Sequence, residues 1–272
     1  MGTVAAEVKT GLAGEGSHWY AKDGTAVYEV PRADGKGYRP ATLRDARKLG
    51  LLPGLTSVIK VMAAPGLERW KQENLLLAAA TLPKQDGEEV EQWMQRVRED
   101  AWAQGEKARE TGTAIHKIIE LLLQGNYVQG ELTRFAMPAL DWITQRFQGQ
   151  DWLVERGFAN RIGYGCRIDF GTVGKRLALV DFKTTDKPLD DVKAWPEHTI
   201  QLAGQAMAVF HDKARDPLEV ECINLFVSTR EPGVKAIVHP VADIAVGWQK
   251  LKRLVELWQL DKQYFPGGPI CS

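Results

Sequence analysis

The sequence has few cysteines, no excess of charge of either sign and no long apolar run. Its three cysteines, Cys166, Cys222 and Cys271, lie far apart without a C-x-x-C pair, which excludes zinc or cluster sites built on such pairs and suits a reducing interior. Lys plus Arg equals Asp plus Glu at 35 each, so the chain as a whole has no net positive charge that would attract nucleic acid or a membrane. No span suits a membrane helix and no apolar signal core is visible, so we expect a cytoplasmic protein.

The chain does have enough apolar residues for a substantial core. Its 272 residues are 44% hydrophobic and 26% charged, which fits one large domain or two small ones. Caps, turns and periodicity predict these elements in the first half: a hairpin turning at Asp23-Gly24, a helix over 43–49 between Thr42 and Gly50, and helices over 65–82, 86–124 and 133–148. We expect the longest helix to bend or break near Gly105 and Gly112.

The second half changes to the period of strands. Alternating or continuous apolar runs predict strands over residues 152–159, 165–171, 176–183, 219–228 and 234–239. Helices are predicted over residues 198–211 and 243–260. With the helix over 133–148 placed first, the order of elements is α, β, β, β, α, β, β, α.

Two acids and a lysine stand out on neighbouring strands. In a strand, residues i and i+2 share a face, so Asp181 and Lys183 point the same way. The turn candidate at residues 173–175 predicts a hairpin centred near residue 175. Such a hairpin places Asp169 opposite Asp181, because cross-strand partners lie equally far from the turn centre. The sequence therefore predicts both carboxylates and the lysine on one surface.

This cluster could be a surface ion pair or a metal site, and the surrounding residues favour the metal site. An Asp-x-Lys pair on a strand is most often a solvated ion pair. Here, however, Asp181 ends the apolar run Leu-Ala-Leu-Val, so its carboxylate should be partly buried, and buried charges are paired or bound to metal. Neighbouring carboxylates repel unless a cation bridges them or one stays protonated, and their hard oxygens suit Mg²⁺ or Mn²⁺.

Further polar residues could join this site or serve the structure alone. His116 and Glu120 share a helix face one turn apart, on the helix that precedes the strands. Glu155, on the first strand, could approach the acid of the second strand or face solvent. Gln201 and Gln205, also one turn apart, could reach a phosphate or support polar packing. The residues alone leave these alternatives open.

Four segments, in order along the chain, resemble motifs of the RecB-like exonuclease group of the PD-(D/E)xK nucleases, which includes phage exonucleases and the mitochondrial genome-maintenance exonuclease. They are Gly112-x-x-x-His116, Ile168-Asp169, Asp181-Phe182-Lys183-Thr184 and the start of a glutamine motif at Gln201. The ordered set is more specific than any one motif. The segments Leu55-Thr56-Ser57-Val58 and Leu67-Glu68-Arg69-Trp70 resemble the N-terminal segment of the phage and mitochondrial members.

The resemblance implies an α/β (α+β) fold of the restriction-endonuclease-like type: an αβββαβ core with a mixed central sheet flanked by helices, after a mainly helical region. Residues 106–272 would form the nuclease core with its C-terminal helix. Residues 1–105 would form a hairpin and helical region that guides DNA. In that region, Trp70, Trp93 or Trp102 would either stack on bases or pack among the helices.

The resemblance also implies the roles of the site residues. Metal ligation would come from His116, Asp169, Asp181 and the Phe182 carbonyl, with Mg²⁺ or Mn²⁺ as the ion. Lys183 would orient or activate the attacking water and complete the catalytic set with both aspartates. Glu155, Glu120 and Gln201 are additional candidates for the site, and substrate contacts would come from Gln201, Gln205 and Thr184.

The chain departs from the family pattern at two positions. Cys166 stands where the family has glycine, and Gln205 replaces the tyrosine of the glutamine motif. Some relatives hold an iron–sulfur cluster with four cysteines. This chain has three, far apart in the sequence, so no such cluster is expected here.

The activity implied is metal-dependent hydrolysis of DNA phosphodiesters by an exonuclease, acting on single strands or duplex ends in recombination, repair or processing of the phage or bacterial type. Two alternatives share the fold: a sequence-specific endonuclease and a catalytically silent DNA-binding accessory protein. The sequence leaves the polarity of digestion, the strand preference and the oligomeric state open.

Overall fold

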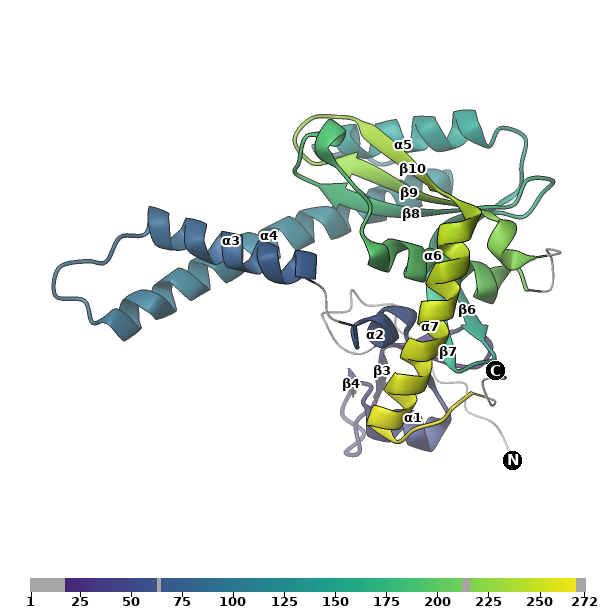
Figure 1. The fold of residues 1–272 in the computed structure, drawn as a ribbon, viewed down its shortest axis with the longest axis horizontal. Helices are drawn as coiled ribbons and strands as arrows, with labels where there is room; N and C mark the ends of the chain where they lie inside the picture. The colour runs from purple at the N-terminus through teal and green to yellow at the C-terminus, as the bar shows by residue number, and fades with distance from the viewer. Residues whose placement is uncertain (1–17, 63–64, 212–215, 268–272) are drawn as a thin grey trace.

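The chain folds around a five-stranded mixed sheet with helices on both faces (Figure 1). The computed structural model describes residues 18–62, 65–211 and 216–267, so Cys271 lies outside the described residues. The strand order is β10-β9-β8-β7-β6, in which β8 and β9 run parallel and the other neighbours antiparallel. The strands are β6 Trp152–Asn160, β7 Tyr164–Thr172, β8 Ala178–Thr185, β9 Glu221–Ser228 and β10 Val234–His239. This confirms the predicted mixed sheet and is consistent with a restriction-endonuclease-like α+β fold.

Two pairs of helices cover the faces of the sheet. Helices α4 (Val90–Leu123) and α5 (Thr133–Arg146) pack on one face, and α6 (Pro196–Val209) and α7 (Val241–Lys262) lie on the other. Along β8, Val180 and Phe182 point toward α4 and α5, while Leu179 points toward α6. By the same alternation, Asp181 belongs to the face under α6. The parallel pairing of β8 and β9 needs a crossover connection, and α6 supplies it.

The first described residues add a small layer at one end of this body. Its elements are β1 Trp19–Tyr20, β2 Ala26–Val27, β3 Glu29–Pro31, β4 Tyr38–Pro40, α1 Leu43–Leu49, β5 Leu52–Pro53 and α2 Leu55–Ile59. The hairpin of β1 and β2 turns at Gly24, and Thr42 and Gly50 bound α1, as predicted. Trp19 packs against Trp258 of α7, so this layer shares a core with α6 and α7.

A long helical arm projects from the sheet body. It consists of α3 (Pro65–Thr81) and the first half of α4, which extend away from the sheet in Figure 1. Trp93 Nε1 donates to Leu82 O at 2.7 Å and joins the two helices near the tip. Among the described side chains of residues 66–103, Ala78 and Val97 are the buried ones.

Of the predicted bend or break in the long helix, the break is wrong, because α4 is continuous over Val90–Leu123. A β-carbon on Gly105 would lie 3.1 Å from the Trp70 ring, and one on Gly112 would lie 2.5 Å from Thr184 Oγ1. Both glycines therefore leave room for a neighbour instead of ending the helix. The domain boundary predicted between residues 105 and 106 falls inside this helix.

The other predicted elements correspond to observed ones within a few residues at each end. The predicted strand over 234–239 coincides with β10. Two short 3-10 helices, Leu189–Asp191 and Pro217–Glu219, complete the structure. In the described part of the chain, no helix has the length and apolar character needed to cross a membrane.

Candidate active site

The hairpin of β7 and β8 has the register predicted from the sequence. Phe170 pairs with Val180 and Gly171 with Leu179, and both pairs are centred on residue 175. The ladder ends at Phe170, so Asp169 and Asp181 are not paired directly, and this detail of the prediction is wrong. The strands part, and Asp169 Oδ2 instead accepts a hydrogen bond from the Phe182 backbone N–H at 2.7 Å.

β7 turns away from β8 at a distortion that it shares with β6. Their ladder skips Glu155 and Asp169, although the residues on either side are paired. Glu155 has a φ of +49°, in the left-handed region that side chains rarely adopt. Phe170 packs toward α4 and α5, whereas Ile168 packs toward α6, so the alternation of β7 changes face between them. Distortions of this kind re-aim side chains, and this one directs Asp169 at β8.

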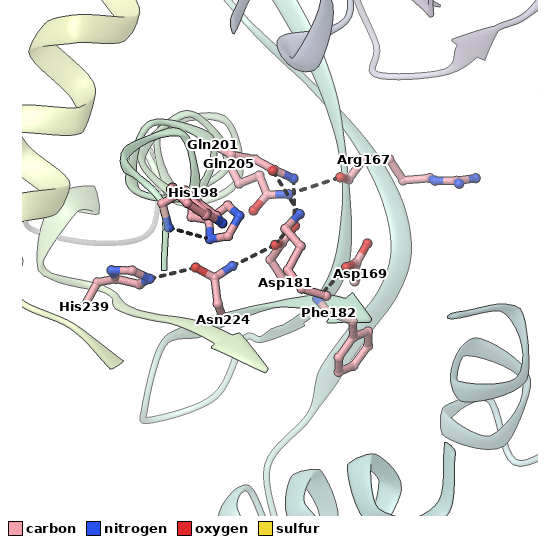
Figure 2. A network of polar contacts seen from close by, with 11 residues as sticks. Arg167, Asp169, Asp181, Phe182, His198, Gln201, Gln205, Asn224 and His239 are labelled. Atoms are coloured by element: carbon pink, nitrogen blue, oxygen red, sulfur yellow. Dashed lines mark hydrogen bonds and ion pairs between the residues drawn. The ribbon is translucent and has the colours of Figure 1, made fainter. Parts of the chain in front are cut away.

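Asp181 is the most enclosed acid of the site, with 2% of its surface exposed. Gln201 Nε2 donates to its Oδ1 at 2.7 Å, and Asn224 Nδ2 donates to its Oδ2 at 2.8 Å (Figure 2). Lys183 Nζ lies 2.7 Å from the same Oδ2, as the shared face of the strand predicted. Three donors therefore hold one carboxylate, which offsets the free-energy cost of burying its charge.

Gln201 joins the acid and the lysine of β8 into one unit. Its Oε1 accepts a hydrogen bond from Lys183 Nζ at 3.2 Å, while its amide nitrogen donates to Asp181. Gln201 lies in the second turn of α6, and the start of this helix is capped by His198, whose Nδ1 accepts the Trp195 backbone N–H at 3.2 Å. These contacts are those of a residue that orders the site, and the predicted contact of Gln201 with substrate stays a prediction.

The charges of the site shift one another's pKa. Burial, followed by the negative charge of Asp181, raises the pKa of Asp169, and His116 and Lys183 offset part of this rise. Burial lowers the pKa of Lys183, but the two carboxylates raise it by more, so the net shift is upward. Burial and the charge of Lys183 lower the pKa of His198 to about 4, so this ring is neutral at pH 7.

His116 approaches the site from α4. Its ring meets the Phe182 ring edge-on, with the centroids 6.1 Å apart. Gly112, one turn earlier, lets α4 come close to β8, because any side chain there would overlap Thr184. The spacing Gly-x-x-x-His thus joins a residue that lets α4 pack on β8 to a residue whose ring contacts Phe182. Thr184 packs against α4, and its predicted substrate contact stays a prediction.

Glu155 is largely enclosed, with 13% of its side chain exposed, so it does not face solvent. Burial and the charge of Asp169 raise the pKa of Glu155 to about 7. Arg167 Nε lies 2.7 Å from Glu155 Oε2, and the arginine side chain remains 48% exposed. Glu120, on α4, pairs with Lys117 at 2.7 Å, and its negative charge contributes to the raised pKa of Glu155.

Gln205 faces the interior. It is 2% exposed, and its Nε2 donates to the Arg167 backbone carbonyl at 3.4 Å (Figure 2). The bond joins α6 to β7 beside the site, and this burial does not support the predicted substrate contact. Cys166, the other departure from the family pattern, is buried in the core shared with the N-terminal layer.

The donor chemistry around the two aspartates suits a hard divalent cation. Among the described contacts, Asp169 Oδ1 accepts no hydrogen bond and Asp181 Oδ1 accepts one, so each has acceptor capacity left. Carboxylate and carbonyl oxygens are the ligands that Mg²⁺ and Mn²⁺ prefer. Within the described residues, no group of three or more His, Cys, Asp or Glu side chains is arranged to hold a metal ion. The three-ligand set of His116, Asp169 and Asp181 stays a prediction.

Sequence reasoning missed Asn224 and His239, which lie behind Asp181. Asn224 interrupts the otherwise apolar stretch Ile223–Val227 of a buried strand. A polar residue in such a strand must find a partner, and this was the available signal. His239, at the end of β10, gives no comparable signal, because a terminal polar residue usually meets solvent.

Comparisons with known proteins give limited information. No family model and no curated protein matches the chain. Three solved structures are each 12% identical to it: a candidate exonuclease from Eubacterium rectale (56% of this chain, 68% of that one, TM-score 0.41), SSO0001 (53%, 75%, 0.30) and an alkaline exonuclease from Laribacter hongkongensis (72%, 98%, 0.28). At these scores the likeness assigns no function to this chain.

Proposed function

We propose that this chain is a metal-dependent nuclease that hydrolyses DNA phosphodiester bonds, acting as an exonuclease. The observation that carries the proposal is the convergence of Asp169, Asp181 and Lys183 at the point where β7 and β8 part. Two acids and a cation at a gap in a sheet, with one acid fully enclosed and the other half-buried, suit the transfer of a phosphoryl group. The order of the sequence motifs supports the same chemistry.

Asp169, Asp181 and the Phe182 carbonyl would hold Mg²⁺ or Mn²⁺, with His116 as a further ligand. Such an ion, when bound, lowers the pKa of a coordinated water and stabilises the charge of the pentacovalent transition state. The protein's own contribution is positioning. The Phe182 N–H fixes Asp169, and Gln201 with Asp181 fixes the Lys183 ammonium, which can then orient water against the phosphate.

Cleavage assays on end-labelled DNA test the proposal. Wild-type protein should degrade linear single- or double-stranded DNA in Mg²⁺ or Mn²⁺, and Lys183→Ala should lose activity while keeping its fold. Lys262→Ala is the matched control, because this lysine is 46% exposed and pairs with a surface aspartate. A Lys183→Ala protein that cleaves DNA as fast as wild type would contradict the assignment.

Covalently closed circles separate the alternatives. An exonuclease leaves them intact, whereas a sequence-specific endonuclease opens them. A silent accessory protein would bind DNA without metal and release no products in either assay.

A further inference from the structure

A row of buried polar side chains runs across three neighbouring strands behind Asp181. Asn224 on β9 stands beside Asp181 on β8 in the parallel register, and His239 lies on β10 (Figure 2). Asn224 is fully buried and His239 is 9% exposed. The same face of the sheet is otherwise lined by apolar residues such as Leu179 and Cys222. A polar pair here must therefore form good hydrogen bonds or destabilise the fold.

The hydrogen bonds of the row have a definite direction. Asn224 Nδ2 donates to Asp181 Oδ2 at 2.8 Å, so its Oδ1 must point away from the carboxylate. His239 Nε2 lies 2.7 Å from that Oδ1. An amide oxygen can only accept, so the Nε2 nitrogen carries the proton. Turning the Asn224 amide over would set an oxygen against the Asp181 carboxylate and a nitrogen against the histidine N–H. The Asp181 carboxylate thus fixes which way the amide faces, and His239 holds the amide there by donating to its oxygen.

We propose that Asn224 and His239 are positioning residues of the nuclease site, and that together they fix the orientation of the Asp181 carboxylate toward the ion and the scissile phosphate. The inference rests on the proposed function. Gln201 on α6 donates a hydrogen bond to Asp181 Oδ1, and Asn224 on β9 donates one to Oδ2. The carboxylate is therefore held by two different elements. Lys183 Nζ also contacts Oδ2, so the position of its ammonium depends on the same carboxylate.

His239 is the informative member of the pair. It contacts neither carboxylate nor lysine in the described bonds, and it acts through the Asn224 amide. A merely structural pair would change the free energy of unfolding when it is removed. A positioning pair would also change kcat and the metal dependence of the folded protein, because partners behind a metal ligand commonly affect activity or metal affinity by roughly 10- to 100-fold.

The experiment compares His239→Phe, which keeps a ring without a donor, with His239→Gln, which can still donate to Asn224. Asn224→Leu removes the amide at similar volume. The matched control is Gln259→Leu, since this buried amide bonds to the Ile162 carbonyl away from the site. We expect His239→Phe and Asn224→Leu to lower kcat and raise the half-saturating Mn²⁺ concentration roughly 10-fold or more, with KM for DNA unchanged. His239→Gln should recover most of the loss, and Gln259→Leu should keep the wild-type kcat.

The double variant distinguishes action through Asn224 from an independent effect. If His239 acts through the amide, the double variant Asn224→Leu/His239→Phe will be no slower than Asn224→Leu alone. Additive losses, or wild-type kcat and metal dependence in the folded single variants, would overturn the proposal. If Asn224→Leu does not fold, the contrast between His239→Phe and His239→Gln decides it.

Failure of the proposed function is separately visible. If wild type cleaves no DNA, the nuclease assignment fails, and calorimetric titration with Mn²⁺ then decides whether the pair positions Asp181. A roughly 10-fold weaker affinity in His239→Phe, recovered in His239→Gln, would support positioning, and equal affinities or no Mn²⁺ binding by wild type would overturn it.

Discussion

The sheet body and the α3–α4 arm are stabilised in different ways. Both faces of the sheet are covered, and fully buried residues such as Ile143 and Phe170 fill the space between it and the helices. In the arm, the exposed side chains include large apolar ones such as Leu76 at 70% and Trp102 at 69%. Its contacts are local ones, such as Trp93 with Leu82 O and Arg96 with Glu88 at 2.9 Å.

The two regions differ in what their structures can support: the sheet body holds a buried polar site, and the arm extends away from it. A buried carboxylate such as Asp181 needs donors from several elements at fixed distances, and packed layers provide them. The arm needs only local contacts between two helices, so it can extend from the body. Within the arm, Trp93 bonds to the Leu82 carbonyl, whereas the Trp102 side chain is largely exposed.

The largest expected difference between the two regions is in catalysis. Asp181→Asn keeps the shape of the side chain but removes its charge, and kcat should fall by at least roughly 10³-fold. Trp102→Ala, in the arm, should leave kcat unchanged, because the residue lies outside the hydrogen-bonded site. Single-turnover cleavage measures both. A comparable loss of kcat in Trp102→Ala would show that the arm takes part in the chemistry.

The same contrast should hold for stability. Ile143→Ala leaves a cavity under the sheet and should lower the free energy of unfolding by about 2–5 kcal/mol. Leu76→Ala removes an exposed side chain, so the change should stay within about 0.5 kcal/mol. Urea denaturation followed by circular dichroism gives both values. Equal losses would mean that the exposed face of the arm is covered in solution.

Two glycines of one helix allow a closer comparison. Gly112→Ala drives a methyl group against Thr184 and should destabilise the protein by about 1–3 kcal/mol. Gly105→Ala meets the edge of the Trp70 ring, which is 41% exposed and can move, and the helix gains up to about 1 kcal/mol of propensity. Thermal unfolding should therefore show opposite signs. If Thr184→Ala does not relieve the Gly112→Ala loss, the contact is not its cause.

The smallest effect should appear in the arm at acid pH. Hydrogen bonds from Arg96 lower the pKa of Glu88 in the folded arm below its ordinary value. The ion pair therefore stabilises the arm when the pH is above the ordinary pKa of a glutamate. This contribution is lost as the pH falls through the pKa of Glu88 in the folded arm. Glu88→Gln should remove this pH dependence. Amide hydrogen exchange of the arm from pH 6 to pH 3 tests it, and exchange that responds equally in both proteins would contradict it.

Local signals in the sequence predicted most of the elements. Thr42 and Gly50 bounded α1, alternation located β10, and the turn centre at residue 175 gave the register of β7 and β8. These depend on residues close in sequence. Asp181 and Lys183 were predicted together for the same reason, because the period of one strand sets their shared face.

Features that depend on distant segments were missed. Glycine in a helix suggests a break, and only Trp70 and Thr184 show that Gly105 and Gly112 make room for neighbours. The ladder end at Phe170 follows from a distortion shared with another strand. No local pattern marks a residue whose strain is imposed by its partner.

The sequence by itself determined which groups are available: two acids, a lysine and a glutamine. The period of a strand put one acid and the lysine on one face, and the turn between two strands brought the second acid near them. The tertiary structure decided what surrounds them. Asn224 could meet Asp181 only after α6 had crossed over to set β9 parallel beside β8, and His239 only after β10 had paired with β9. Hydrogen bonds act over about 3 Å, so the environment of a buried charge is fixed by whichever strands become neighbours.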